Sequence, residues 1–114
     1  MRTFHLVLVL ATALPVHAET RRYALILADP PVAERFHSAE ERSSEAGREY
    51  RSRIEKTQAE LRAELERRQI RVTGATQVLT NSVFVAAPRE RERELRALPG
   101  VKTVMPLSRK YKLR

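Results

Sequence analysis

The sequence predicts an α+β fold, in which two helices cover one face of a four-stranded antiparallel sheet. Three observations carry this prediction. Residues 23–28 form an apolar run of strand length, residues 48–68 repeat apolar positions at helical spacing, and residues 70–106 hold three β-rich runs around a charged segment. A chain of 114 residues has room for one domain of this kind.

The first strand is expected at residues 23–28, where Tyr-Ala-Leu-Ile-Leu-Ala is apolar throughout. The Asp-Pro-Pro sequence that follows ends the strand, because proline cannot donate to a strand ladder. Residues 32–47 are mostly polar, with Val32 and Phe36 isolated among them. We expect a loop or a frayed helical lead-in over this segment, ending near Gly47.

The pattern changes to a helical period over residues 48–68. The other faces of this helix carry arginine, glutamate, glutamine and lysine, which favour the helical state. Two pairs at i,i+4 spacing, Glu49–Arg53 and Glu64–Arg68, are expected to add about 0.3 kcal/mol each. The stripe expected to face the core consists of Tyr50, Ile54, Leu61 and Leu65, with Thr57 and Gln58 filling its middle turn.

Two further strands are expected at residues 70–79 and 83–87. The link between them, Thr80-Asn81-Ser82, is short and polar, so the two strands are expected to form an antiparallel hairpin. Gly74 interrupts the first of these runs and is expected to mark a β-bulge.

A second helix is expected from Pro88, which suits a first helical turn, to Leu98. Leu95 and Leu98 would face the core, and the Pro-Gly sequence that follows ends the helix. Residues 101–106 form the last expected strand. In that strand we expect one face to carry Val101, Thr103 and Met105, and the other face to carry Val104.

The expected order is therefore β-α-β-β-α-β, the order of the ferredoxin-like sandwich. Two helices would cover one face of its sheet and leave the other face open. In a domain this small, an open sheet face usually meets a partner or a ligand.

The first 18 residues are expected to form a signal peptide and not part of the fold. Arg2 precedes an apolar run of about ten residues, half of the roughly 20 that span a bilayer, and Ala18 ends a suitable cleavage site. The sequence also lacks cysteine, so no thiol is present to anchor it by acylation. We therefore expect a secreted or periplasmic protein, free of the membrane after cleavage, with a domain at 19–107 and a tail at 108–114.

Three stretches of this chain resemble the N-terminal prosegment of subtilisin-like serine proteases. They are residues 79–85 (Leu-Thr-Asn-Ser-Val-Phe-Val), residues 95–106 with their Leu-Pro-Gly-Val sequence, and residues 23–31 ending in Asp-Pro-Pro. The sequence departs from the family at Ser82, where glycine is common. It also stops at Arg114, where most relatives continue into a protease domain.

The resemblance implies an inhibitor, and a folding chaperone, of a subtilisin-like serine protease. In that family the open sheet face docks on the protease, and the C-terminal tail lies in its active-site cleft. The domain would be a monomer when free. The tail residues that would contact the protease are Ser108, Arg109, Lys110, Tyr111, Lys112, Leu113 and Arg114.

A register for this tail follows if the natural chain ends at Arg114. Arg114 would then occupy the pocket beside the catalytic serine, with Leu113, Lys112 and Tyr111 in the next three sites outward. Tyr111, the one aromatic residue of the tail, would anchor in an apolar pocket. The competing interpretation is a disordered basic terminus.

The sequence does not favour an enzyme. Asp29, His37 and Ser38 could be imagined as a catalytic triad, but neighbours on one polar loop lack a scaffold that makes them converge. His37 is the only histidine after Ala18, so neither a metal site nor a cofactor is expected.

Nucleic-acid binding is not expected either. The net charge is +8, but most basic residues alternate with acidic ones along the expected helices. Base stacking needs aromatic residues on the strands, and the single candidate, Phe84, is expected in the core. The alternative that remains open is a secreted self-associating or protein-binding module that has no protease target.

Overall fold

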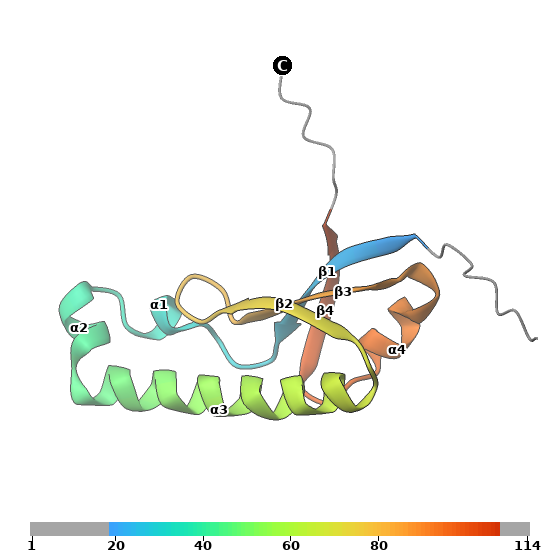
Figure 1. Ribbon diagram of the computed structural model, residues 1–114. Helices are drawn as coiled ribbons and strands as arrows, with labels where there is room; N and C mark the ends of the chain where they lie inside the picture. Colours follow the sequence, from blue (N-terminus) through green and yellow to red (C-terminus); the bar gives the residue numbers. More distant parts are fainter. Residues whose placement is uncertain (1–18, 108–114) are drawn as a thin grey trace, which may run out of the picture.

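The computed structural model describes residues 19–107. The predicted signal peptide (1–18) and the predicted tail (108–114) lie outside the described residues. The elements in chain order are β1 (Thr20–Leu27), α1 (Val32–Arg35), α2 (Ala39–Ser43), α3 (Glu45–Arg67), β2 (Arg71–Thr76), β3 (Ser82–Pro88), a 3-10 turn η1 (Arg89–Arg91), α4 (Glu92–Arg96) and β4 (Val101–Leu107) (Figure 1).

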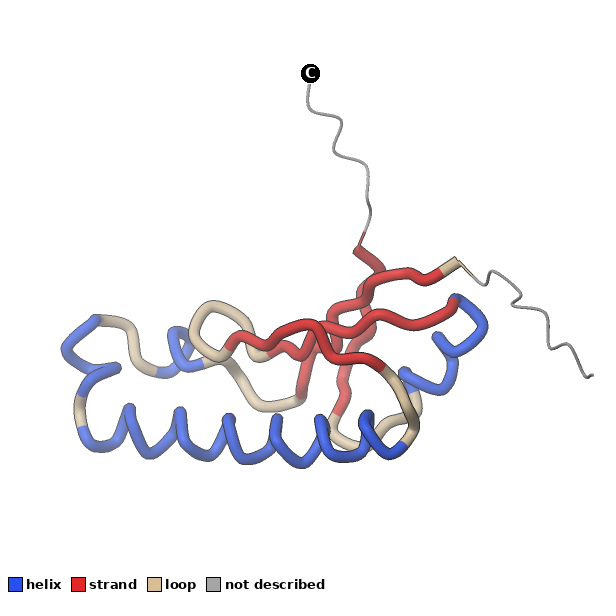
Figure 2. Tube along the Cα trace, viewed as in Figure 1, coloured by secondary structure: helices blue, strands red, loops and turns tan. Residues whose placement is uncertain are grey.

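The four strands form one antiparallel sheet in the order β2-β3-β1-β4, so β2 and β4 are its edges. Helices α3 and α4 lie on the same side of this sheet, and the described residues place no helix on the other side (Figures 1 and 2). The prediction of an α+β fold with a four-stranded antiparallel sheet is confirmed.

The main core lies between the sheet and these two helices. Alternate residues of the strands point into it, because successive side chains of a strand face opposite sides. The expected stripe of α3 is buried along its length, and Gln58 is buried with it. The main cluster consists of Tyr23, Leu25, Leu27, Leu61, Leu65, Ile70, Val83, Val85, Ala87, Leu95, Leu98 and Val104, while Val32, Tyr50 and Ile54 form a smaller cluster under α1.

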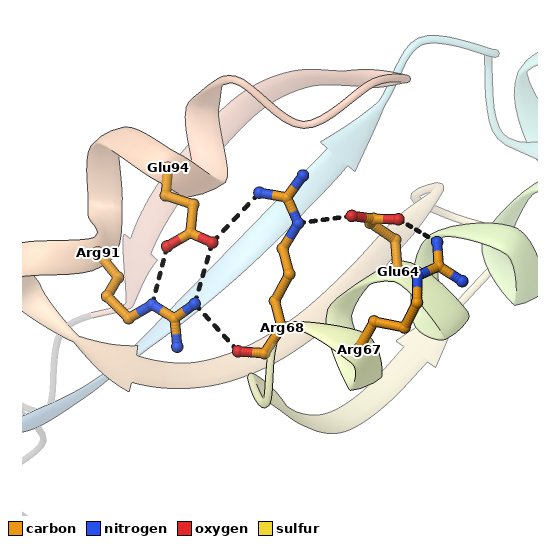
Figure 3. A network of polar contacts seen from close by, with 5 residues as sticks. All are labelled: Glu64, Arg67, Arg68, Arg91 and Glu94. Atoms are coloured by element: carbon orange, nitrogen blue, oxygen red, sulfur yellow. Dashed lines mark hydrogen bonds and ion pairs between the residues drawn. The ribbon is translucent and has the colours of Figure 1, made fainter.

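An ionic network joins the end of α3 to the η1–α4 segment (Figure 3). Arg68 donates to Glu64 at 2.6 Å, which confirms that expected pair, and also to Glu94 at 3.2 Å. Arg91 donates to both oxygens of Glu94 and to the backbone carbonyl of Arg68 at 3.0 Å. The last bond satisfies a carbonyl at the C-terminus of α3 that has no partner within the helix.

The expected pair between Glu49 and Arg53 does not form. The salt bridges within residues 19–107 do not include it, and the guanidinium of Arg53 lies 5.5 Å from the centre of the Tyr50 ring. Arg35 approaches the same ring at 4.9 Å, so the tyrosine holds two cations. The guanidinium of Arg53 is therefore placed for a cation–π contact with Tyr50 instead of a salt bridge with Glu49.

Of the two expectations for residues 32–47, a loop or a helical lead-in, the structure supports the helical one: α1 and α2 lie there, and capping side chains start α2 and α3. Ser38 accepts from the Glu41 backbone N–H at 3.0 Å, and Glu41 accepts in return from the Ser38 N–H at 3.3 Å, which starts α2. Ser44 caps α3 by accepting from the backbone N–H of Gly47 at 3.1 Å. At Gly47 a Cβ would lie 2.4 Å from the Glu41 carbonyl oxygen, so only glycine lets α2 fold back so closely.

The second helix is shorter than predicted. Pro88 does not open it but ends β3 with extended backbone, and the α-helical part begins at Glu92 after one 3-10 turn. Leu95 and Leu98 are buried as expected. Burial of these two leucines therefore anchors this short, highly charged segment to the core.

Two bulges shift the sheet register. Thr73 is the extra residue of β2 beside Gly74, which confirms the predicted bulge. Lys102 is the extra residue of β4, and it reverses the alternation there. Val101 consequently packs against the core together with Val104, so the prediction that Val101 shares a face with Met105 is wrong.

Candidate functional site

The candidate site is the sheet face that α3 and α4 leave uncovered, which we call the open face. Its central row crosses all four strands, because residues opposed in an antiparallel ladder share a face. The side chains in this row are apolar, and only Met105 on the edge strand is large and well exposed, at 45 %. The row consists of Gly74, Phe84, Ala24 and Met105, in the order β2-β3-β1-β4.

Phe84 lies on the open face, so the prediction that it belongs to the core is wrong. Its chain neighbours Val83 and Val85 are both buried against the helices, and Phe84 therefore points the other way and is half-buried. A Cβ on Gly74 would lie 3.8 Å from Cδ2 of the ring, which places the ring beside the backbone of β2. The strict alternation of Val-Phe-Val was the signal in the sequence that could have placed it.

The flanking rows give the open face its chemistry. One row is small and mostly polar, and the other combines leucine and alanine with two arginines. Leu107, at the end of β4, is 41 % exposed and adds to the apolar surface of Met105. The first row is Thr76, Ser82, Ile26 and Thr103, and the second is Arg71, Ala86, Arg22 and Leu107.

Strand β4 connects this face to the segment that the resemblance assigns to a protease cleft. It is an edge strand, with one ladder to β1 and a free opposite side among the described residues. Residues 108–114 follow it directly but lie outside the described residues, so none of the seven predicted tail residues has a position here. The last described residue, Leu107, lies at the edge of the open face.

The β2–β3 loop forms one end of the site and is held by buried amides. Gln58 donates to Asn81 at 2.8 Å and to the Thr76 carbonyl at 2.9 Å, while Asn81 donates to the Asp29 carbonyl at 3.0 Å. Asn81 is 2 % exposed, whereas Leu79 in the same loop is 81 % exposed. The amide network thus holds an exposed leucine in a fixed loop.

A shallow hollow of about 280 Å³ lies where this loop meets the open face. Ile26 of the open face, Leu79 of the loop and Lys102 of β4 all line it. The hollow connects the central strands to the exposed leucine, and Asp29 and Glu34 also line it.

The electrostatics of the two faces differ. Hydrogen bonds from arginines lower the pKa of Glu64, Glu92 and Glu94, and all three carboxylates belong to the helical side. On the strands the sequence supplies only positive charges: Arg21, Arg22, Arg71 and Lys102.

Other chemistry finds little support in this part of the chain. The Ser38 hydroxyl is engaged as the N-cap of α2, and the His37 backbone N–H donates to the Glu41 carboxylate at 2.7 Å. Between Glu19 and Leu107 no three side chains of the metal-binding types gather into a ligand set. Nor does any helix in that range combine the length and apolarity needed to cross a bilayer.

Comparison of this chain with protein-family models, with curated proteins and with solved structures gives no match.

Proposed function

We propose that this chain inhibits a subtilisin-like serine protease. In this proposal the open face docks on the protease, and residues 108–114 lie as an extended strand in the active-site cleft. The observation that carries the proposal is the uncovered sheet face with its apolar central row, which continues through the edge strand β4 into the tail. The sequence resemblance supplies the class of partner.

We also assign the chain to the ferredoxin-like sandwiches. Two features support this assignment: the strand order β2-β3-β1-β4, and a long helix α3 and a short helix α4 on the same side of the sheet. The short helices α1 and α2 are additions between β1 and α3. The proposal includes export through the signal peptide at 1–18, and a monomer in the absence of the protease.

The tail would bind by strand addition. An extended segment pairs its backbone with an exposed strand of the protease, and its alternate side chains fill the protease pockets. Tyr111 is the aromatic residue that would anchor it. Replacing Tyr111 by alanine should therefore weaken inhibition, and removing residues 111–114 should weaken it further. If both changes leave inhibition intact, the tail does not act in this register.

A second candidate is self-association through the same surface. Met105 and Leu107 are exposed apolar residues of an edge strand, and such an edge can pair with a second copy. This alternative requires the open face but not the tail. Sedimentation of the free protein at increasing concentration distinguishes the two hypotheses, because the inhibitor hypothesis predicts a monomer at every concentration.

The deciding experiment measures inhibition of a panel of subtilisin-like proteases by two forms of the protein. One form comprises residues 19–114, and the other ends at Leu107. Both contain every residue of the two core clusters, so both retain the complete core. Strong inhibition by the longer form that is lost in the shorter form is the expected result. Failure of the folded longer form to inhibit any protease in the panel would overturn the proposal.

A further inference from the structure

The open face carries two arginines that form no salt bridge with a carboxylate of residues 19–107. Arg22 on β1 and Arg71 on β2 are both exposed, and both stand opposite Ala86 of the strand between them. Neither forms a salt bridge with any residue of the described range 19–107. Like charges one strand apart repel each other, so the pair is not explained by stability.

On the helical side, glutamates lie among the arginines and pair with several of them, although others, such as Arg62 and Arg93, form no salt bridge within residues 19–107. There Arg51 pairs with Glu55, Arg91 with Glu94 and Arg96 with Glu92, each at 3.3 Å or less. The four strands, by contrast, contain no aspartate or glutamate at all. The positive charge of the open face is therefore left for something outside the domain to neutralise.

The geometry gives the pair a defined spacing. Strands in a sheet lie about 4.8 Å apart, so two residues separated by one strand are about 10 Å apart at their backbones. Ala86 forms a low floor between Arg22 and Arg71, and the apolar row with Phe84 and Met105 lies directly beside it. A bound surface would meet an apolar strip with two cations along one border.

We infer that this face selects a protein partner whose apolar contact patch is bordered by carboxylates. The inference rests on the proposed function, and it specifies the protease surface on which the domain docks: that surface carries aspartate or glutamate side chains facing Arg22 and Arg71. Charge pairs at the border of an interface act mainly on the association rate and on the choice of partner. The two arginines are thus specificity residues, and the apolar row provides the contact area.

A protein fits this face better than a nucleic acid. Stacking of successive bases needs several aromatic residues, and Phe84 is the only one on the open face; its ring is half-buried beside Gly74. Met105 and Leu107 expose apolar surface that a phosphate backbone would not cover. Binding of single-stranded RNA is therefore a result that would contradict the inference, and the test below includes it.

The test compares two double charge reversals in the 19–114 protein. The first is Arg22→Glu with Arg71→Glu. The matched control is Lys56→Glu with Arg93→Glu, which changes the net charge equally but alters exposed residues of α3 and α4 that form none of the salt bridges described above. Inhibition constants and association rates are measured against the most strongly inhibited protease of the panel, at about 0.05 M and about 0.5 M salt.

The open-face variant should weaken inhibition about tenfold at low salt, mostly through slower association. The difference should shrink at high salt, because screening removes the charge attraction. The control variant should stay within about twofold of the unchanged protein. Equal effects of the two variants, or no effect of either, would overturn the inference while leaving the proposed inhibition in place.

A second measurement reads the face without any protease. Amide NMR signals of the protein are followed during titration with an amphipathic peptide that alternates leucine and glutamate, and with its lysine counterpart. The glutamate peptide should shift the signals of Arg22, Phe84 and Met105, and the Arg22→Glu, Arg71→Glu variant should lose these shifts. Equal binding of the lysine peptide, or tighter binding of an eight-nucleotide single-stranded RNA, would overturn the inference whether or not the protein inhibits a protease.

Discussion

The two faces of the sheet are built from alternate residues of the same strands, yet they differ in every physical respect. Along β3, Val83 and Val85 are buried under the helices, while Phe84 and Ala86 remain on the open face. On the helical side, several arginines, among them Arg68 and Arg91, pair with glutamates. On the open face, Arg22 and Arg71 have no such partners within residues 19–107.

This difference separates the residues that stabilise the fold from those that are available to bind a partner. Apolar area removed from water stabilises the fold, so the covered face should account for most of the free energy of unfolding. A residue of the open face loses little when the domain folds alone and becomes important only when a partner covers it. Substitutions that are chemically alike should therefore have opposite consequences on the two faces.

The largest effect on stability is expected from a leucine of the covered face. Leu65 of α3 is fully buried in the main cluster, and Leu65→Ala should lower the free energy of unfolding by about 3 kcal/mol, the usual cost of a cavity at such a site. The matched change Leu107→Ala removes the same atoms from a residue that is 41 % exposed and should cost less than about 0.5 kcal/mol. Urea denaturation measures both. Equal losses would contradict the division between the faces.

A smaller effect is expected at the amide network under the β2–β3 loop. Asn81→Ala would remove one of the two acceptors of the Gln58 amide and the side-chain donor to the Asp29 carbonyl, at a cost of about 2 kcal/mol. The control is Leu79→Ala in the same loop, whose side chain is exposed and should change stability by less than about 0.5 kcal/mol. Thermal unfolding compares the two. A stable Asn81→Ala protein would mean that the loop does not depend on this network.

A still smaller and pH-dependent effect is expected where Arg91 joins Glu94 and the end of α3. Hydrogen bonds from Arg91 lower the pKa of Glu94 below its ordinary value of 4.5. A carboxylate with a lowered pKa stabilises the fold above its unfolded pKa, and this contribution is lost as the pH falls through the folded value. Arg91→Gln should therefore cost about 1 kcal/mol near pH 7 and less near pH 3.

The measurement is urea denaturation of both proteins across this pH range. The difference in unfolding free energy between them should narrow toward acid, because protonated Glu94 gains little from Arg91. A difference that stays constant with pH would show that Arg91 acts only through its bond to the Arg68 carbonyl.

The regular elements could be predicted from the sequence because their periodicity is long. The stripe that includes Tyr50, Ile54 and Leu65 repeats over about four turns of α3, and the polar Asn-containing link indicates the β2–β3 hairpin. The helices α1 and α2 could not be predicted in this way, since four or five residues are too few to show a period. α2 begins at its Ser38 cap, and the segment that leads into α1 is held by the Tyr50 hydroxyl, which donates to the Pro30 carbonyl at 2.6 Å.

The candidate site was predictable only in outline. A β-α-β-β-α-β order with two helices implies an open face, but which residues occupy it depends on the strand register. Phe84 was assigned to the core because apolar residues are usually buried, although its place between Val83 and Val85 decides otherwise. Val101 was assigned to the wrong face because the bulge at Lys102 reverses the alternation, and no residue in β4 is of a type that predicts a bulge. The approach of Arg22 to Arg71 also needs the register, since β1 and β2 are distant in the sequence.

The sharpest version of the comparison uses two neighbours on β4. Val104 is 3 % exposed and points to the core, while Met105 is 45 % exposed and points to the open face. Val104→Thr keeps the shape but buries a hydroxyl, so it should cost about 1–2 kcal/mol. Met105→Gln keeps the length, makes the side chain polar and should change stability by less than about 0.5 kcal/mol.

Inhibition should rank the same two variants in the opposite order. Met105→Gln places an amide at the β4 end of the apolar row in the proposed contact, where a partner would have to desolvate it, so inhibition of the protease should weaken several-fold although the domain is as stable as before. Val104→Thr, assayed where it remains folded, should inhibit as well as the unchanged protein, because its side chain faces α4 and the core. If Met105→Gln inhibits normally, the contact does not extend to β4, and the tail alone would have to account for the affinity.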